Sequence, residues 1–123
     1  MNTTQQSTAK HHRWDAIERE QITPAIGRQY VTADRVTVAR FELTKGGVVP
    51  KHKHDNEQVS YVLSGGLRFR FPDQEFVARA GELVQIPGGV EHEVEVLEDT
   101  VVIDVFSPVR QDWINKTDTY FGR

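Results

Sequence analysis

Short runs of Val, Ile, Phe, Tyr and Thr follow one another from about residue 28 to residue 106, and turn-forming residues separate them. Apolar and polar residues alternate within many of these runs, which is the period of a strand with one buried face. Branched and aromatic residues favour strands, whereas Gly, Pro and Asp favour the turns between them. The pattern predicts strands at residues 29–33, 35–44, 48–53, 57–64, 67–72, 75–79, 82–86, 90–97 and 100–106.

The two ends of the chain have different patterns. Residues 1–13 are mainly polar and predict a disordered or extended tail, because such a composition buries too little apolar surface to offset the entropy of ordering. Residues 14–123 then form the folded domain. Spaced apolar residues from Trp14 to Ile26 predict an irregular or briefly helical segment that packs against it, and residues 110–115 predict a short C-terminal helix.

The strand pattern predicts an all-β fold in a single domain. So many short strands at even spacing favour a closed barrel or a two-sheet jelly roll, because an open sheet of this size leaves exposed edges. A chain of 123 residues has room for one hydrophobic core, and neither a repeat nor a linker divides it.

Composition and charge exclude several classes of function. The 15 Lys and Arg residues are interleaved with 18 Asp and Glu residues, so no basic face predicts a nucleic-acid partner. Cysteine is absent, which excludes disulfides, thiol nucleophiles and thiolate metal sites. Any metal must therefore bind through nitrogen and oxygen. The polar N-terminal stretch contains no export signal or membrane span, so we expect a cytoplasmic protein without a membrane partner.

Three of the five histidines lie within the predicted strands. His52 and His54 are two residues apart, so on an extended strand both rings face the same side. The same parity brings Asn56 and Gln58 to that face and turns Glu57 away. His92 lies on a later strand, which a barrel can bring opposite the first pair. A single strand histidine is more often packed or solvated than a ligand, so a metal site requires these four residues to converge.

The strand at residues 100–106 carries an acid on one face. Val102, Asp104 and Phe106 alternate with apolar residues, and an ionisable group in an apolar strand is costly to bury without a partner. Two interpretations stay open. Asp104 either caps a turn or forms a structural salt bridge with Arg110, or it faces the barrel lumen together with Phe106 and Arg110.

The spacing of the histidines and the surrounding glycines resembles the two motifs of the cupin superfamily. In the first motif, Gly46, His52, His54, Gln58 and Gly65 are separated by five, one, three and six residues. In the second motif, Gly81, Pro87, Gly89 and His92 are separated by five, one and two residues. This resemblance implies a double-stranded β-helix, or jelly-roll barrel. It also implies one divalent transition metal ion (Ni, Zn, Fe or Mn) bound by His52, His54, Gln58 and His92.

The chain departs from the cupin motifs at two positions. Val96 replaces the Asn that is frequent in the second motif, and Gln58 replaces the usual Glu. Four neutral ligands leave a divalent ion with its full charge, which favours an anionic ligand. The carboxylate of the two-histidine, one-carboxylate triad of non-haem iron oxygenases is also missing. Glu57 supplies it only if a bulge shifts the strand parity.

The C-terminal part resembles the small cupins of the KdgF type, which act in pectin and alginate degradation. The residues that carry this likeness are Asp104, Phe106, Arg110, Asp112, Trp113, Tyr120 and Phe121, with the run from Tyr61 to Gly65. The resemblance implies conversion of 4,5-unsaturated monouronates to linear 4-deoxy-5-keto-uronates. Asp104 would then act as general acid and base, Phe106 as an apolar wall, and Arg110 as the partner of the substrate carboxylate.

An enzyme of this type is the preferred interpretation, and two alternatives stay open. One is another metal-dependent cupin enzyme, a dioxygenase or isomerase acting on a small acidic or aromatic substrate. The other is a non-catalytic cupin that binds a small anion or sugar. The resemblance also implies a homodimer, and the partner expected in each case is a small anionic, sugar-like molecule.

The remaining charged and aromatic residues predict surface or packing roles. Alternation predicts outward-facing charges at Arg68, Arg70, Glu91, Glu93 and Glu95. Arg40 has the parity to reach either a pocket or an interface. Core or dimer contacts are expected for Trp113, Tyr120 and Phe121.

Overall fold

A computed structural model describes residues 7–119 of the chain. Most of this part is strand. The elements in chain order are η1 (Trp14–Ala16), β1 (Glu20–Thr23), β2 (Ile26–Thr32), β3 (Thr37–Leu43), β4 (Val48–His52), β5 (Glu57–Ser64), β6 (Gly66–Arg70), β7 (Glu75–Arg79), β8 (Leu83–Ile86), β9 (His92–Val96), β10 (Thr100–Ser107) and α1 (Gln111–Ile114).

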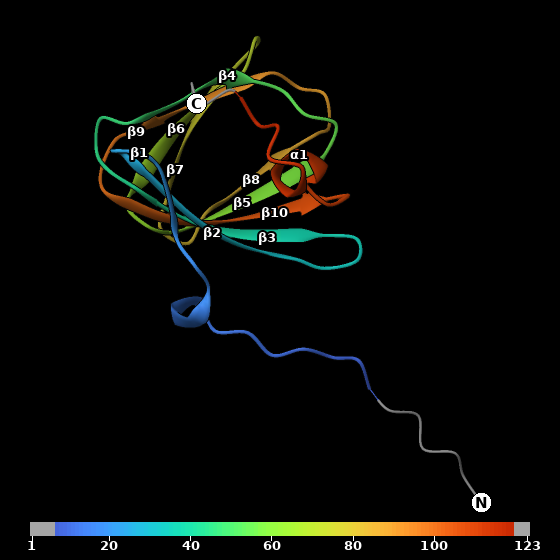
Figure 1. Ribbon diagram of the computed structural model, residues 1–123. Coiled ribbons are helices and arrows are strands. Elements are labelled where there is room, and N and C mark those ends of the chain that lie inside the picture. Colours follow the sequence, from blue (N-terminus) through green and yellow to red (C-terminus); the bar gives the residue numbers. More distant parts are fainter. Residues whose placement is uncertain (1–6, 120–123) are drawn as a thin grey trace, which may run out of the picture.

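The strands form two antiparallel sheets. The larger has the order β1-β2-β3-β10-β5-β8, and the smaller has the order β4-β9-β6-β7. The sheets face each other across a common interior, as the view along the barrel shows (Figure 1). The all-β jelly-roll architecture predicted from the strand pattern is therefore confirmed.

Alternating burial along the central strands forms the interior. In β10 the residues at even positions from Thr100 to Phe106 are buried, while those between them are only half-buried. β3 and β9 alternate in the same way, so each strand points every second side chain into the lumen. Apolar groups from both sheets meet there, including Phe41, Val62, Leu67, Phe69, Ile86, Val96, Val102 and Phe106.

The N-terminal part of the domain differs from the expectation. Glu20–Thr23 forms β1 where an irregular segment was predicted, and β2 starts at Ile26, earlier than the predicted residue 29. Gln21 and Glu20 pair with Gly27 and Arg28 of β2, so a tertiary partner completes a strand that is too short to show a period of its own. Another predicted strand, residues 48–53, ends at His52.

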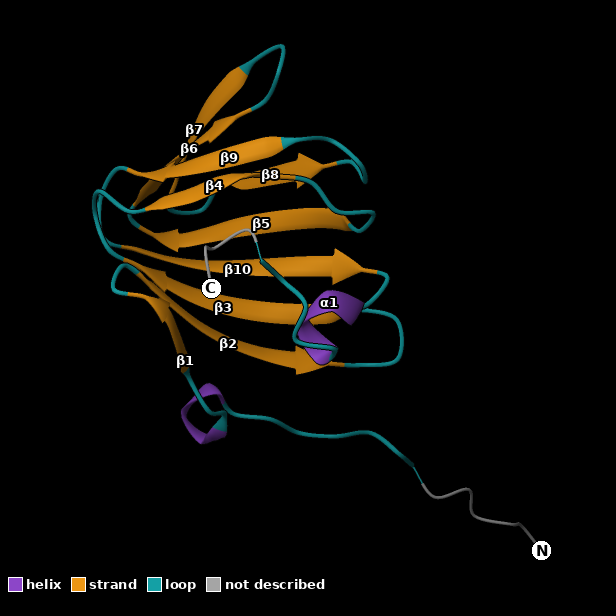
Figure 2. Ribbon diagram, turned by 45° about the horizontal axis from the view of Figure 1, so that its top comes forward, coloured by secondary structure: helices purple, strands orange, loops and turns teal. Residues whose placement is uncertain are grey.

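Residues before β1 cover the outer side of β2. The Gln29 side chain donates to the carbonyl oxygens of Trp14 (2.6 Å) and Ile17 (2.9 Å), which holds η1 against the sheet. Residues 7–13 are exposed and belong to no helix or strand, and they extend away from the barrel (Figure 2). The division into a tail at residues 1–13 and a domain at residues 14–123 stays a prediction, because residues 1–6 and 120–123 lie outside the described part.

Helix α1 is the short C-terminal helix that the sequence predicts. It lies beside the ends of β3 and β10 (Figure 2) and buries Trp113 in the core. The predicted contacts of Tyr120 and Phe121 fall outside the described residues. Within residues 7–119, no helix is long and apolar enough to cross a membrane.

The charged residues assigned to the surface lie on outer strand faces. Arg70 forms ion pairs with Glu93 (3.1 Å) and Glu95 (2.7 Å), so β6 and β9 are linked by charges outside the barrel. Arg40, whose direction the sequence left open, pairs with Glu42 (2.6 Å) on the outer side of β3. The side chain of Arg40 does not line the central pocket.

Candidate metal centre and adjoining pocket

The three strand histidines meet at one end of the barrel. His52 ends β4 and His92 begins β9, and these two residues are direct partners in the sheet. Their ring centroids lie 4.4 Å apart, and the His54 ring lies 5.2 Å from that of His92. One ring nitrogen from each histidine lies within 4.8 Å of the others. The convergence expected of the three imidazoles is therefore present.

The turn before His92 holds the histidine segments together. Gly89 has a φ of 80°, a left-handed conformation that a side chain disfavours. The Gly89 amide donates to the His54 carbonyl oxygen (2.8 Å) and so ties the turn before His92 to the segment after His52. The motif glycine therefore positions two candidate ligands relative to each other.

Backbone carbonyl oxygens orient all three imidazoles in the same way. His52 Nδ1 lies 2.7 Å from the Pro50 carbonyl oxygen, and His54 Nδ1 lies 3.1 Å from that of Asn56. His92 Nδ1 lies 2.8 Å from the Val90 carbonyl oxygen. A carbonyl oxygen only accepts, so each Nδ1 carries the proton and each Nε2 keeps its lone pair. This outer-sphere arrangement is typical of metal-binding histidines.

The amide of Gln58 completes a set of neutral donors. Its Nε2 donates to the Ser60 hydroxyl oxygen (3.0 Å), which directs Oε1 toward His54 Nε2 at 3.1 Å. With the His54 proton on Nδ1, two lone pairs face each other across this distance. Nε2 of His92 is also buried and has no hydrogen-bond partner within residues 7–119. A cation satisfies all of these atoms, so the residues present fit a divalent metal ion.

Burial keeps the histidines neutral. It lowers the pKa of His52 to about 3 and the pKa of His54 to about 4, and it lowers the pKa of His92 as well. Removal from water disfavours the imidazolium, and the nearby rings and Arg110 add to this effect for His52 and His54. Neutral imidazoles are the form that binds metals, so the site is ready for an ion at neutral pH.

The lowered histidine pKa values predict that acid destabilises the metal-free protein. Unfolded histidines titrate near pH ~6.5. Below this pH they bind protons that the folded rings reject until about pH 3 for His52 and about pH 4 for His54, so the histidine contribution to the free energy of unfolding falls as the pH drops. Asp104, whose pKa is raised, contributes in the opposite direction. Thermal unfolding of chelator-treated protein between pH 7.5 and 4.5 measures this loss. The variant His54→Gln should show a shallower pH dependence, and an equal slope in both proteins would contradict the assignment.

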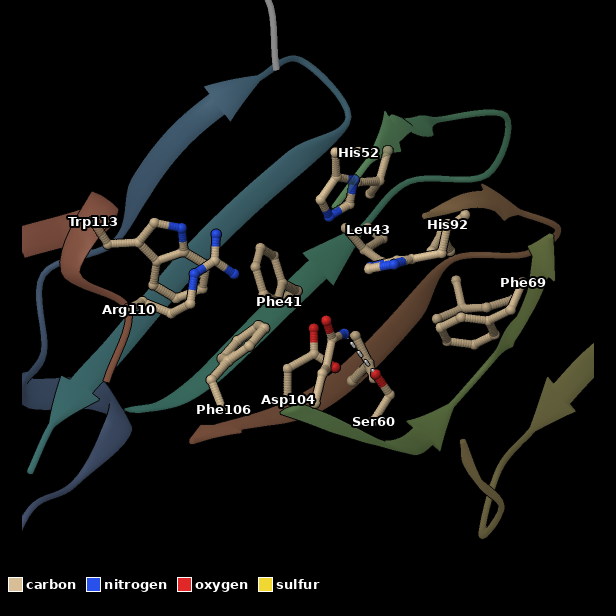
Figure 3. Close-up of a pocket in the computed structure, with 15 residues that line it drawn as sticks. Phe41, Leu43, His52, Ser60, Phe69, His92, Asp104, Phe106, Arg110 and Trp113 are labelled. Carbon is tan, nitrogen blue, oxygen red and sulfur yellow. Dashed lines mark hydrogen bonds between the residues drawn. The ribbon is translucent and has the colours of Figure 1, made fainter. Parts of the chain in front are cut away.

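Asp104, Phe106 and Arg110 lie on the pocket side of the barrel next to the histidines (Figure 3). Asp104 and Phe106 face inward from β10, opposite Ser60 and Gln58 of β5. The side chain of each of the three residues is largely buried, with 8% of Asp104, 2% of Phe106 and 1% of Arg110 exposed. The structure thus brings together the metal-ligand candidates and the residues expected to surround the substrate.

The Asp104 carboxyl is buried beside the polar side chains of Ser60 and Gln58. Among the described residues its Oδ1 atom has no hydrogen-bond partner. Burial raises the pKa of Asp104 to about 6, against the opposing influence of hydrogen bonds with Ser60 and Gln58 and the charge of Arg110. A carboxyl group with such a pKa exchanges protons near neutral pH, which suits it to general acid and base chemistry.

The Arg110 guanidinium forms its ion pair with Asp112. Nε and Nη2 donate to the two Asp112 oxygens at 2.9 Å and 2.7 Å, and Arg110 Cζ lies 4.6 Å from the centre of the Phe106 ring. The Arg110 backbone amide donates to the Thr37 hydroxyl oxygen (2.9 Å), which fixes the start of this segment. The salt bridge considered between Asp104 and Arg110 is therefore replaced by one with Asp112, and the geometry favours the interpretation that Asp104 faces the lumen.

Several residues around the pocket were not predicted from the sequence as site residues. Ser60 shares the strand parity of Gln58, and that alternation was the signal for it. Asn56 lies between His54 and Gln58, and its amide donates to the carbonyl oxygens of Pro108 (2.6 Å) and Val109 (3.1 Å). This long-range contact has no sequence signal. The apolar part of the lining consists of Phe41, Leu43, Val49, Leu67, Phe69, Val94, Val102 and Trp113. Glu57 is exposed, as the parity predicted.

Comparison with known proteins finds a matching family model and a similar protein of known family. The family model described as "Cupin domain" matches residues 39–106, which include all four candidate metal ligands. The pectin degradation protein KdgF of Dickeya dadantii (strain 3937) is 29% identical over 103 residues, which span 81% of this chain and 94% of that protein.

Two solved structures resemble the whole barrel. KdgF from Halomonas sp. has a TM-score of 0.75 and 25% sequence identity, covering 80% of this chain and 94% of that one. An RmlC-like cupin from Shewanella frigidimarina NCIMB 400 has a TM-score of 0.79 and 27% identity, covering 85% of this chain and 96% of that one. The likeness therefore extends over nearly the full length of these small proteins.

Proposed function

The chain belongs to the cupin domain family, and from this premise we propose that it is a metal-dependent enzyme that opens the ring of a small 4,5-unsaturated uronate. The product would be the linear 4-deoxy-5-keto-uronate. The observation that carries the proposal is the buried Asp104 carboxyl, which faces the same pocket as two of the imidazoles and the Arg110 guanidinium. Similarity to a pectin degradation protein supports a uronate, because pectin consists of uronate units.

The proposed metal ligands are His52, His54, Gln58 and His92. A divalent ion bound there supplies Lewis acidity that polarises substrate oxygens. Imidazole and amide ligands suit nickel, zinc, iron and manganese alike, so the availability of each metal decides which one binds. In the absence of a carboxylate ligand, the site keeps a net positive charge that attracts an anion.

The proposed substrate contacts follow from the chemistry of a uronate. Arg110 presents a planar, permanently charged guanidinium, which pairs well with the substrate carboxylate. The Phe106 ring packs beside Arg110 and provides an apolar surface for one side of the sugar. Most of the pocket lining is apolar, which excludes water and strengthens the ionic contact.

The reaction is an isomerisation, so no atom is gained or lost. The anomeric hydroxyl loses a proton, its oxygen becomes the aldehyde, and the bond between C1 and the ring oxygen breaks. The ring oxygen becomes the ketone at C5 as a proton is added to C4. Asp104 is the group that we assign to these proton transfers, because its pKa of about 6 lets it both accept and donate near neutral pH.

A direct test is the incubation of metal-loaded protein with an unsaturated monouronate released by a polysaccharide lyase. We expect the ultraviolet absorbance of the conjugated double bond to disappear faster than in buffer, and nuclear magnetic resonance to identify the linear keto acid. Chelator-treated protein should be inactive and should recover when metal is added. Metal-loaded protein that leaves the absorbance unchanged would overturn the proposal.

Two other measurements test the alternatives. Oxygen consumption by the iron-loaded protein with a small acidic or aromatic substrate would indicate a dioxygenase. Thermal stabilisation by a sugar acid without turnover would indicate a binding protein. A homodimer and a cytoplasmic location remain predictions from the sequence, and light scattering of the purified protein tests the first.

Replacing Gln58 by glutamate should weaken substrate binding. The change keeps the shape of the side chain and adds one negative charge beside the metal site, where Gln58 Oε1 lies 3.1 Å from His54 Nε2. At an effective dielectric constant near ~20, one charge a few ångströms from an anion costs more than ~1.4 kcal/mol, so we expect KM to rise about tenfold or more. Kinetics of the metal-loaded variant, with its metal content measured, check this. A lower KM would contradict the role assigned to the neutral ligand.

A further inference from the structure

Aromatic rings and guanidinium groups alternate in a column that leads from the pocket to the base of the C-terminal segment. Arg110 Cζ lies 4.6 Å from the centre of the Phe106 ring and 4.4 Å from that of Trp113. Arg28 Cζ lies 4.2 Å from the centre of the Trp113 ring and 5.3 Å from that of Tyr30. Trp113 is thus the ring that contacts both cations.

The far end of this column is anchored away from the pocket. Arg28 is 1% exposed and forms ion pairs with Asp118 (3.2 Å) and Glu20 (3.1 Å). Asp118 follows helix α1, while Glu20 lies on β1, so the Arg28 guanidinium joins the C-terminal segment to the sheet. Arg28 does not line the central pocket, although Trp113 does.

The near end of the column carries the proposed carboxylate-binding group. Asp112 binds one edge of the Arg110 guanidinium, but a carboxylate contact along one edge lets the plane of the group tilt. Rings packed against a guanidinium restrict that tilt and favour the cation electrostatically. The contacts of Arg110 with Phe106 and Trp113 therefore fix the plane as well as the position of the charge.

We propose that Trp113 is a positioning residue: it holds the Arg110 guanidinium in the orientation that binds the substrate carboxylate, and Arg28 in turn holds Trp113. This inference rests on the proposed function, since it assigns a carboxylate to Arg110. Trp113 itself does not act on the reacting atoms. Its contribution is to substrate affinity and to the distinction between acidic and neutral sugars.

A positioning role differs from simple filling of the core. Leucine at position 113 would still occupy part of the interior, yet it would leave both guanidinium groups without a ring. Phenylalanine would keep a ring for them. The two variants therefore separate the aromatic contact from the buried volume, and Ile26→Ala provides a control, because Ile26 is 1% exposed and lies outside the pocket lining.

The kinetic test compares metal-loaded Trp113→Leu, Trp113→Phe and Ile26→Ala with the wild type. We expect Trp113→Leu to raise KM for the unsaturated uronate by about 3- to 30-fold, the range that cation–π contacts support, with a much smaller change in kcat. Trp113→Phe should recover most of the loss. Ile26→Ala should lower the melting temperature and leave KM near the wild-type value. Equal KM values in Trp113→Leu and the wild type would overturn the proposal.

A binding measurement makes the test independent of turnover. Galacturonate, a saturated uronate, serves as the probe in calorimetric titrations of the same metal-loaded proteins, and its affinity should fall in Trp113→Leu by the same factor as KM rises. The chain has two tryptophans, so a Trp14→Phe background leaves Trp113 as the sole indole. Its fluorescence should change when galacturonate binds, and the change should vanish in Arg110→Lys.

The outcomes distinguish this inference from the proposed function. If the wild type binds galacturonate but does not consume the unsaturated uronate, the proposed function fails and the affinities still decide the role of Trp113. If turnover is normal and Trp113→Leu binds galacturonate as tightly as the wild type, the positioning role fails alone. A wild type that binds no uronate overturns both.

Discussion

Replacing Asp104 with asparagine is expected to lower kcat on an unsaturated uronate by about 10²- to 10⁴-fold, the usual contribution of a positioned acid or base. Asparagine has nearly the same shape but does not exchange a proton. KM and metal content should change much less, because Asp104 is not among the proposed metal ligands. Steady-state kinetics of metal-loaded variants, with bound metal measured by mass spectrometry, check the expectation.

Stability measurements separate a loss of chemistry from a loss of folding in this variant. Burial raises the pKa of Asp104 to about 6, so the folded protein holds a proton that the unfolded chain has released above pH ~4. The ionised carboxylate therefore destabilises the fold at neutral pH, and the neutral amide should raise the free energy of unfolding of the metal-free protein by up to about 3 kcal/mol.

A matched control for Asp104→Asn is Asp73→Asn. Asp73 is exposed in the turn between β6 and β7 and does not line the central pocket, so its amide variant should keep wild-type kinetics. Wild-type kcat in Asp104→Asn would remove Asp104 from the mechanism. The pH dependence of kcat in the wild type should in addition report the titration of Asp104 at or below pH 6, because a bound cation lowers the pKa that burial raises.

Replacing His52 with alanine should abolish metal retention and reduce activity to the background rate. Loss of even an outer-sphere partner of a metal ligand costs about 10- to 100-fold in affinity, so loss of a ligand should cost more than ~100-fold. His52 suits this test because it lies half-buried at the end of β4, whereas His92 is 2% exposed. Removal of His52 therefore disturbs the core less than removal of His92.

Two measurements follow the effect of His52→Ala. Dialysed protein should contain far less metal than the wild type, and added metal should no longer raise the melting temperature, since ligands stabilise a fold in proportion to their binding. His12→Ala is the matched control, because His12 is exposed ahead of β1, outside the histidine cluster. Equal metal content in His52→Ala and the wild type would exclude His52 as a ligand.

The parity of the strands predicted which side chains share a face, and the resemblance to cupins predicted which of these faces is the lumen. Alternation at Gln58, and at Asp104 and Phe106, is a local property of an extended backbone, and the structure places all three side chains in the pocket. The same rule placed Glu57 outside. The strand pattern therefore predicted the all-β fold, and the resemblance to known cupins predicted most of the candidate site.

Local patterns did not determine how the strands pair. The strand β1 has only four residues, too few to show a period of two, and its hairpin pairing with β2 identifies it as a strand. His52 and His92 become neighbours through the register between β4 and β9. This register depends on the balance of contacts across the whole barrel.

The sequence by itself determined the fold class, the sets of residues that share a strand face and the all-nitrogen-and-oxygen donor set, because each follows from residue type and a period of two. Only the tertiary structure decided the imidazole tautomers, the pairing of Arg110 with Asp112 and the contact of both cations with Trp113. It also decided the raised pKa of Asp104. The tautomers and the Arg110–Asp112 pair depend on contacts between residues only two positions apart, whereas Trp113 meets Arg28 from a distant segment. In each case the direction of the side chains depends on burial and on packing within the barrel, which local spacing does not encode.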